Sequence, residues 1–280
     1  MTNFFSEALG LTPSAFTLLR NLIHDRTGIY FEDGKQDILA DKLSPRVIEA
    51  GFDSFLDYYY LLKYDTDRPE EWGRLLNTIT VQETYFWREL DQIRALIDVI
   101  LPEYTAAHPG HPIRIWSAAC ATGEEPLTMA MALEEGGWFG RNPVTIHASD
   151  ASAAALQKAR EGIYRGRSFR NLPSQLKTRY CREDSEGQRV SPSLHDRIRW
   201  HRANLMVDEE IRSMAESPFI FCRNVFIYFS KESIKKTVAL FHRHMPTPGF
   251  LFTGASESLL TITRDFELEE IGGAFVYVKR

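Results

Sequence analysis

The sequence predicts an α/β protein in which a small all-α domain precedes a doubly wound parallel sheet that ends in an antiparallel hairpin. Two observations support this fold class. From about residue 12 to 80, apolar residues recur every three or four positions with no alternating strand between them. After residue 110, short apolar runs alternate with helical segments, which is typical of parallel strands joined by helical crossovers.

The first part reads as a helical domain over residues 1–80. Ser14 and Ser54 stand before "AFTLLRNLIHDRTG" and "FLDYYYLLKYD", and we expect both serines to cap the helices that follow. A helix over 35–50 contains Pro45, which we expect to kink or divide it, because proline lacks the N–H that an internal helical position needs.

The second part, residues 81–280, carries five apolar runs that we predict to be parallel strands: "IRIWSA", "VTIHASD", "IRWHRANL", "FIFCRNV" and "GFLFTGAS". The last segment, "FELEEIGGAFVYVKR", predicts two strands joined around Gly272 and Gly273. Residues 166–197 are the least regular stretch, which indicates a small insert.

Composition excludes several classes of protein. At 280 residues and 44% hydrophobic content the chain can bury a substantial core. Its apolar runs are short, and the N-terminus "MTNFFSEALG" has no basic region before an apolar stretch, so we expect no membrane span, no signal peptide and a cytoplasmic location. The net charge is −5, and residues 1–75 hold 8 Lys and Arg against 13 Asp and Glu, which argues against nucleic-acid binding.

Three widely spaced cysteines, Cys120, Cys181 and Cys222, fit neither a disulfide framework nor a metal-ligand pattern. We therefore expect reduced, buried thiols and no bound metal.

The turn after the first predicted strand, residues 117–125, indicates the kind of ligand. In an open parallel sheet, ligands bind beyond the carboxyl ends of the strands. This turn has small residues for close approach, but Glu124 and Glu125 would repel a pyrophosphate. A cationic amine, a sulfonium or ribose hydroxyls suit it better. The alternative is that both carboxylates only favour the helix dipole, with Thr122 and Glu125 forming a capping box.

Asp150 ends the second predicted strand, where doubly wound cofactor domains place an acid on ribose hydroxyls. Alternatively, Asp150 caps the helix that begins near Ser152. Combined with a turn that disfavours phosphate, Asp150 points to S-adenosylmethionine or a close relative.

Four stretches resemble the CheR-type chemotaxis receptor glutamate O-methyltransferases: "TVQETYFWRE" at 80–89, "IWSAACATGEEP" at 115–126, "SDASAAALQKAREGIYR" at 149–165 and "FIFCRNVFIYFSKES" at 219–233. Their order and spacing match over nearly the full chain. The resemblance implies a class I methyltransferase domain, a small β-subdomain within about 166–197, and a substrate-facing helical domain. It also implies S-adenosylmethionine as the cofactor, S-adenosylhomocysteine as the product, and the cytoplasmic domain of a methyl-accepting chemoreceptor as the partner.

The resemblance assigns roles to individual residues. Glu125 is expected near the cofactor's amino-acid end and Asp150 on its ribose, while Arg88 and Tyr228 are the expected catalytic residues. The other expected cofactor contacts are Gln82, Thr84, Ala119, Asn204, Leu205, Asn224 and Val225, with Arg88 contacting both cofactor and acceptor. Gln82 replaces the asparagine of many relatives, which puts that contact in question.

The implied acceptor is a glutamate carboxylate, which is already ionised at neutral pH because its reference pKa is about 4.3. Positioning rather than a general base must then supply most of the catalysis, and the planar guanidinium of Arg88 suits that task. The helix over 35–50 carries Lys35, Lys42 and Arg46 beside Asp37, Asp41 and Glu49, a more mixed charge than in well-known relatives.

We expect a monomer. We also expect that it works independently of a receptor's C-terminal pentapeptide, because the stretch before Trp200 is shorter than in relatives that bind such a pentapeptide. The alternative functions are a sensor or adaptor that binds S-adenosylmethionine without transfer and, less favoured, a small-molecule methyltransferase.

Overall fold

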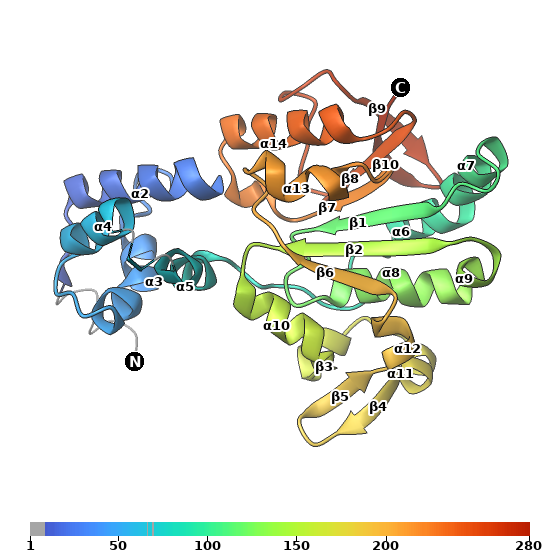
Figure 1. Cartoon of the computed structure of the whole chain (residues 1–280), viewed down its shortest axis with the longest axis horizontal. Helices are drawn as coiled ribbons and strands as arrows, with labels where there is room; N and C mark the ends of the chain where they lie inside the picture. The colour runs from blue at the N-terminus through green and yellow to red at the C-terminus, as the bar shows by residue number, and fades with distance from the viewer. Residues whose placement is uncertain (1–8, 66, 69) are drawn as a thin grey trace.

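The computed structural model describes residues 9–65, 67–68 and 70–280 (Figure 1). The expectation that the first residues form no signal peptide concerns residues 1–8, which lie outside this description. The helical part consists of α2 (Pro13–Thr27), α3 (Gln36–Glu49), α4 (Phe55–Tyr64) and α5 (Glu70–Ile79). It lies at one end of the sheet in Figure 1, on the left of the view. The expected domain bounds, 1–80 and 81–280, stay a prediction.

A buried carboxylate ties three of these helices together. Glu71 of α5 is 3% exposed and accepts hydrogen bonds from Arg46 Nε of α3 at 2.7 Å and from the Tyr58 hydroxyl of α4 at 2.7 Å. The apolar faces of the helices meet around fully buried Leu19, Leu39 and Leu75. The predicted helical domain is therefore a packed unit with its own core.

Two local predictions in this part are wrong. Thr12, not Ser14, caps α2: its side chain accepts from the N–H of Ala15 at 3.2 Å, because Pro13 takes the first helical position. Division of the helix at Pro45 is the second wrong prediction, since α3 runs unbroken across it, while a kink there stays a prediction. Ser54 caps α4 as predicted, accepting from the N–H groups of Leu56 and Asp57.

The main sheet has seven strands in the order β6-β2-β1-β7-β8-β10-β9. Its strands are β1 (Ile113–Ala118), β2 (Val144–Asp150), β6 (Ile198–Arg202), β7 (Phe219–Cys222), β8 (Gly249–Thr253), β9 (Glu267–Ile271) and β10 (Ala274–Lys279). The first five pair in parallel, and the β9–β10 hairpin around Gly272 and Gly273 joins β8 antiparallel, so both predictions are confirmed.

Helices cover both faces of this sheet. In Figure 1, α13 (Asp208–Ala215) and α14 (Lys231–His244) lie above the strands, and α8 (Glu124–Glu135), α9 (Trp138–Arg141) and α10 (Ala153–Glu161) lie below. Neighbouring residues of β1 enter different cores, Ile115 on one side and Trp116 on the other. A bent helical run precedes β1, made of α6 (Leu90–Ala95), η1 (Leu96–Ile100) and α7 (Leu101–Ala107). This arrangement is the α/β fold that the sequence predicted.

A second, three-stranded sheet lies beside the main one, in the order β3-β5-β4. Its elements are β3 (Ile163–Tyr164), η2 (Gly166–Phe169), α11 (Ser174–Tyr180), β4 (Cys181–Asp184), β5 (Gly187–Val190) and α12 (Pro192–His195). The unit begins before residue 166, because α10 ends at Glu161 with Gly162 as its left-handed cap and β3 follows directly.

The three cysteines are free and buried, as predicted. Across the part of the chain that the structure describes, no group of three or more His, Cys, Asp or Glu side chains is arranged to hold a metal ion. Within the same residues, no helix has the length and apolar character needed to cross a bilayer.

Candidate functional site

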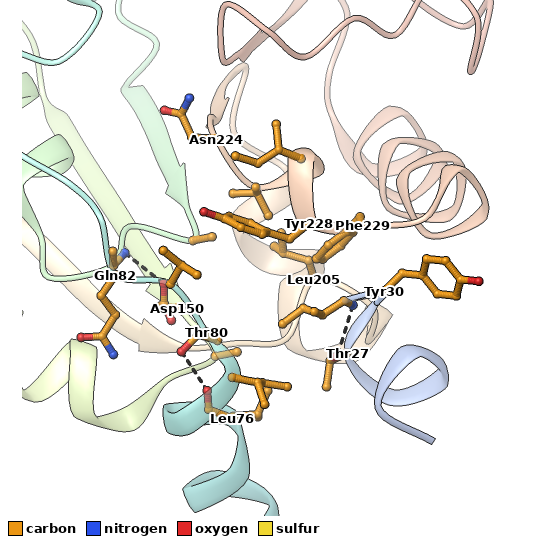
Figure 2. Close-up of a pocket in the computed structure, with 18 of the residues that line it drawn as sticks. Thr27, Tyr30, Leu76, Thr80, Gln82, Asp150, Leu205, Asn224, Tyr228 and Phe229 are labelled. Carbon is orange, nitrogen blue, oxygen red and sulfur yellow. Dashed lines mark hydrogen bonds between the residues drawn. The ribbon is translucent and has the colours of Figure 1, made fainter. Parts of the chain in front are cut away.

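A cavity of about 550 Å³ lies between the helical part and the carboxyl ends of the parallel strands, within the usual volume range of ligand pockets (Figure 2). Residues from both parts of the chain line it. The sheet side contributes Ala119, Ala121, Asp150, Ala203, Asn204, Leu205, Asn224, Val225 and Tyr228. The helical side and the segment after it contribute Thr27, Tyr30, Phe31, Lys35, Ile38, Lys42, Leu76, Ile79, Thr80 and Gln82.

The backbone on the sheet side adopts an uncommon conformation. Ala119, Ala121 and Asn224 have φ angles of 57°, 49° and 59°, and none of them is a glycine. Such left-handed residues cluster at functional sites, where surrounding structure holds them in place. They turn small side chains and backbone groups toward the cavity, so a ligand can approach the main chain closely.

Asp150 is positioned at the end of β2 by two backbone donors. Its Oδ1 accepts from the N–H of Ser152 at 2.8 Å and its Oδ2 from the N–H of Ala121 at 2.9 Å. Burial raises the pKa of the Asp150 carboxyl, and these hydrogen bonds oppose the shift. Each oxygen keeps an acceptor site that a ligand hydroxyl can use. Ser152, not Asp150, caps α10 by accepting from Ala155, so the capping alternative for Asp150 is wrong.

Glu125 lies at the start of α8 and is neutralised by an arginine. Its Oε2 is 2.7 Å from Nε of Arg223, and its Oε1 accepts from the Ser117 hydroxyl at 2.6 Å. Gly123 is the N-cap of α8, so the capping box of Thr122 and Glu125 is wrong. A Cβ at Gly123 would lie 2.9 Å from Trp200, and its φ of 94° disfavours a side chain as well, which explains the single glycine of this turn.

Glu124, unlike Glu125, lines neither the large cavity nor the smaller one beside it. It is 2% exposed and accepts from the hydroxyls of Thr122 at 2.6 Å and Ser168 at 2.8 Å, the latter in the small sheet unit. Burial raises the pKa of the Glu124 carboxyl. The two adjacent carboxylates therefore have different surroundings, and Glu124 anchors the turn to the neighbouring unit.

A smaller cavity of about 50 Å³ adjoins the first and contains the remaining predicted residues. Thr84, Arg88 and Glu125 line it, and Ala119 and Asn224 line both cavities. All eleven residues predicted from the sequence therefore line one cavity or the other. Their contacts with a ligand stay predictions.

Arg88 lines the smaller cavity and Tyr228 lines the larger one. Arg88 Nη1 donates to the carbonyl of Glu83 at 2.8 Å. Tyr228 ends η3 (Phe226–Tyr228), and Figure 2 shows its hydroxyl pointing away from Phe229, toward the side of the cavity where Gln82 and Asn224 lie. Burial raises the pKa of Tyr228, and the charge of Arg88 partly lowers it. Tyr228 is therefore a neutral hydroxyl at neutral pH.

Two residues that the sequence reasoning missed hold this region in shape. Arg223, 6% exposed, donates to the carbonyls of Glu89 at 2.8 Å and Arg88 at 2.9 Å besides pairing with Glu125. Arg223 directly precedes Asn224 in "CRNV", and this position beside a predicted site residue could have indicated it. Glu257 accepts from the N–H groups of Asn224 and Gly254, both at 2.7 Å, and burial raises its pKa. "ASESLL" carries no motif that would have indicated it.

Two protein-family models match this chain, one over each of its two parts. The family model described as "CheR methyltransferase, SAM binding domain" matches residues 82–274, and the one described as "CheR methyltransferase, all-alpha domain" matches residues 14–80.

Curated relatives match over most of their length. Chemotaxis protein methyltransferase 2 of Vibrio cholerae is 32% identical over 272 residues, covering 96% of this chain and 94% of that protein. The chemotaxis protein methyltransferases of Salmonella typhimurium and Escherichia coli are each 32% identical over 269 residues, covering 94% of this chain and 90% and 91% of those proteins.

Proposed function

The chain belongs to the CheR methyltransferase family, and from this premise we propose that it transfers the methyl group of S-adenosylmethionine to glutamate side chains of methyl-accepting chemoreceptors. Family membership makes it a methyltransferase of chemotaxis that depends on S-adenosylmethionine. The proposal adds the acceptor group, a glutamate carboxylate in the receptor's cytoplasmic domain, and the product, a methyl ester.

The residues present fit S-adenosylmethionine. A buried carboxylate, Asp150, keeps free acceptor capacity for ribose hydroxyls, and Leu205 and Val225 offer apolar contact for a purine. No lysine or arginine lines the large cavity from the catalytic domain, 81–280, all of which the structure describes, so that wall is not built for a pyrophosphate. When bound, the cofactor supplies an electrophilic methyl group on a sulfonium centre.

Arg88 and Tyr228 are the residues that we assign to the transfer step. The acceptor carboxylate is the nucleophile and is ionised without a general base. Arg88 can pair with one of its oxygens through a planar fork and leave the other oxygen free to attack. The neutral Tyr228 hydroxyl can donate a hydrogen bond without reducing nucleophilicity as a second cation would. Positioning within a site that excludes water then provides most of the rate enhancement.

The observation that carries the proposal is the convergence of the eleven predicted residues on two adjoining cavities at the meeting of both parts of the chain. An acceptor that docks on the helical part would present its side chain to the same space that Tyr228 lines. We propose that this acceptor segment belongs to a receptor and that the enzyme works in the cytoplasm as a monomer.

The test is transfer of labelled methyl from S-adenosylmethionine to cytoplasmic fragments of the organism's own receptors. We expect base-labile label that maps to glutamate residues, because methyl esters hydrolyse readily in base. Receptor fragments with those glutamates changed to glutamine provide the control and should take up no label. Cofactor binding without label on any receptor would contradict the proposal and favour the sensor or adaptor function.

We also propose that the enzyme works without a C-terminal receptor pentapeptide. In the small sheet, only Ser185 and Glu186 separate β4 from β5, which leaves a short hairpin for gripping a peptide. Receptor fragments with and without their C-terminal five residues should therefore be methylated at equal rates, and a loss of more than about tenfold on removal would contradict this.

A further inference from the structure

The end of helix α2 and the turn after it contact two loops of the catalytic domain. The side-chain amide of Asn204 donates to the carbonyl of Arg26 at 2.7 Å. The backbone N–H of Tyr30 donates to the carbonyl of Tyr228 at 2.9 Å, and Ile29 forms a β-bridge with Phe229. One short segment of the helical part is thus bonded to the loop of Asn204 and to the loop of Tyr228.

His24 adds a side-chain contact to the same place. Its Nε2 lies 2.8 Å from the hydroxyl of Ser230 and 3.0 Å from that of Ser233, at the first turn of α14. Ser230 is the N-cap of α14 and follows Tyr228 by two positions. His24 therefore holds the far end of the loop that presents Tyr228.

The packing between these segments is close. Gly28 has a φ of 80° and ends α2 as its left-handed cap. A Cβ at this position would lie 2.8 Å from the Phe229 ring and 3.0 Å from the sulfur of Met206. Both the backbone conformation and the available space therefore require glycine here. The backbone of α2 reaches the Tyr228 loop without an intervening side chain.

The loop that carries Tyr228 is thus held at two ends by different parts of the molecule. Glu257 of the catalytic domain binds the N–H groups of Asn224 and, at 3.2 Å, Ile227. The α2 end binds the carbonyl of Tyr228 and the serines beyond it. Since the same α2 end also binds Asn204, it sets the spacing between the predicted purine side of the cavity and the Tyr228 hydroxyl.

We propose that the segment 24–30 positions Tyr228 for methyl transfer, with His24 as the positioning side chain. This inference rests on the proposed function. The helical part then contributes to the transfer step itself, in addition to any contact it makes with the acceptor. A displacement of about 1 Å at a reacting group costs about 100-fold in rate, so a partial loosening of the loop should lower turnover measurably.

The experiment compares three variants of the full chain by steady-state kinetics with S-adenosylmethionine and a receptor fragment. We expect His24→Ala to lower kcat about tenfold, with both KM values within about twofold of the parent. His24→Gln places an amide within reach of the two serines and should restore most of the lost kcat. His111→Ala, an exposed histidine before β1, is the matched control and should leave kcat unchanged.

Other outcomes overturn the inference. If the parent protein transfers methyl and His24→Ala has the same kcat, this inference is overturned and the proposed function still holds. A loss that His24→Gln does not restore, or one that follows a fall in folded fraction, indicates a merely structural role and also overturns it. Absence of transfer by the parent overturns the proposed function itself. If His24→Ala fails to fold, Ser233→Ala removes one of the two contacts and should lower kcat about threefold by the same reasoning.

Discussion

The two walls of the large cavity are built in different ways. The wall from the catalytic domain has left-handed backbone at Ala119, Ala121 and Asn224, and a buried carboxylate at Asp150. The wall from the helical part is mainly apolar, with Ile38, Leu76 and Ile79 among its lining residues, and carries Lys35 and Lys42 near them.

The difference indicates a division of work. Left-handed backbone and buried carboxylates destabilise a folded chain unless other contacts hold them, so their presence on one wall indicates a ligand that needs them. An apolar wall excludes water and supports whatever docks on it, without directing a polar ligand. We therefore propose that the catalytic wall recognises the cofactor and that the helical wall contacts the acceptor.

The largest expected effect comes from Arg88, which lines the smaller cavity beside the large one. Arg88→Ala should lower turnover at least about 100-fold, while the Kd for S-adenosylmethionine stays within about threefold, because the role that we propose for the guanidinium is to orient the acceptor. Arg88→Lys keeps the charge without the planar fork and should give an intermediate rate. Turnover by labelled-methyl transfer and Kd by calorimetry measure the two effects. Unchanged turnover in Arg88→Ala would refute its assigned role.

The next largest effect tests cofactor binding by the wall from the catalytic domain. Asp150→Asn should raise the Kd for S-adenosylmethionine about 10- to 100-fold, since one hydroxyl acceptor becomes an amide donor, while the KM for the receptor changes little. Glu124→Gln is the matched control, because Glu124 is also buried at this turn but lines neither cavity. It should leave the Kd within about twofold. Equal losses in both variants would show that the turn, rather than Asp150, determines affinity.

A smaller effect tests the helical wall. Ile38 of α3 is 46% exposed at the cavity. If an acceptor covers it, Ile38→Ser loses about 1 kcal/mol of apolar burial and raises the receptor KM about fivefold, with the Kd for cofactor unchanged. Ile48→Ser, on the same helix and 42% exposed but outside the cavity lining, is the control. If Ile38→Ser raised the Kd for the cofactor instead, the proposal that the two walls have separate roles would be wrong.

The smallest expected effect concerns pH. Burial raises the pKa of Glu124 in the folded chain, so the folded state binds a proton more tightly than the unfolded state. The contribution of Glu124 to the free energy of unfolding then falls as pH rises from its unfolded-state pKa of about 4.3 through its folded-state pKa. Relative to the parent, Glu124→Gln should gain unfolding temperature as pH is raised from 4 to 7. A difference between the two proteins that does not change with pH would contradict the cause assigned to this shift.

The sequence predicted well those features that local pattern determines. Short apolar runs that alternate with helical segments indicated the parallel strands. Asp150 was predicted to line the ligand site because the carboxyl end of a parallel strand lies at the edge of the sheet where ligands bind. The cap at Thr12 was missed in favour of Ser14, although Pro13 marks a first helical position and so indicated Thr12. The start of the small sheet was likewise placed too late, although Gly162 marked the end of α10.

Other features depend on contacts between distant segments, which no local pattern encodes. Glu257 supports Asn224 across 33 residues of chain, and His24 reaches Ser230 across 206. The different surroundings of Glu124 and Glu125 also depend on distant segments. Ser168 binds the Glu124 carboxylate and Arg223 binds that of Glu125, and both partners lie far along the chain. Such partners become visible only when the fold brings them together.

We propose above all that S-adenosylmethionine binds between these two walls with its ribose on Asp150. A crystal structure of the full chain with S-adenosylhomocysteine tests it most directly. We expect the ligand in the large cavity, with both ribose hydroxyls within hydrogen-bonding distance of the Asp150 carboxylate and its amino-acid end toward Glu125 and Arg88. A ligand bound elsewhere, or in this cavity with its ribose turned away from Asp150, would contradict the account.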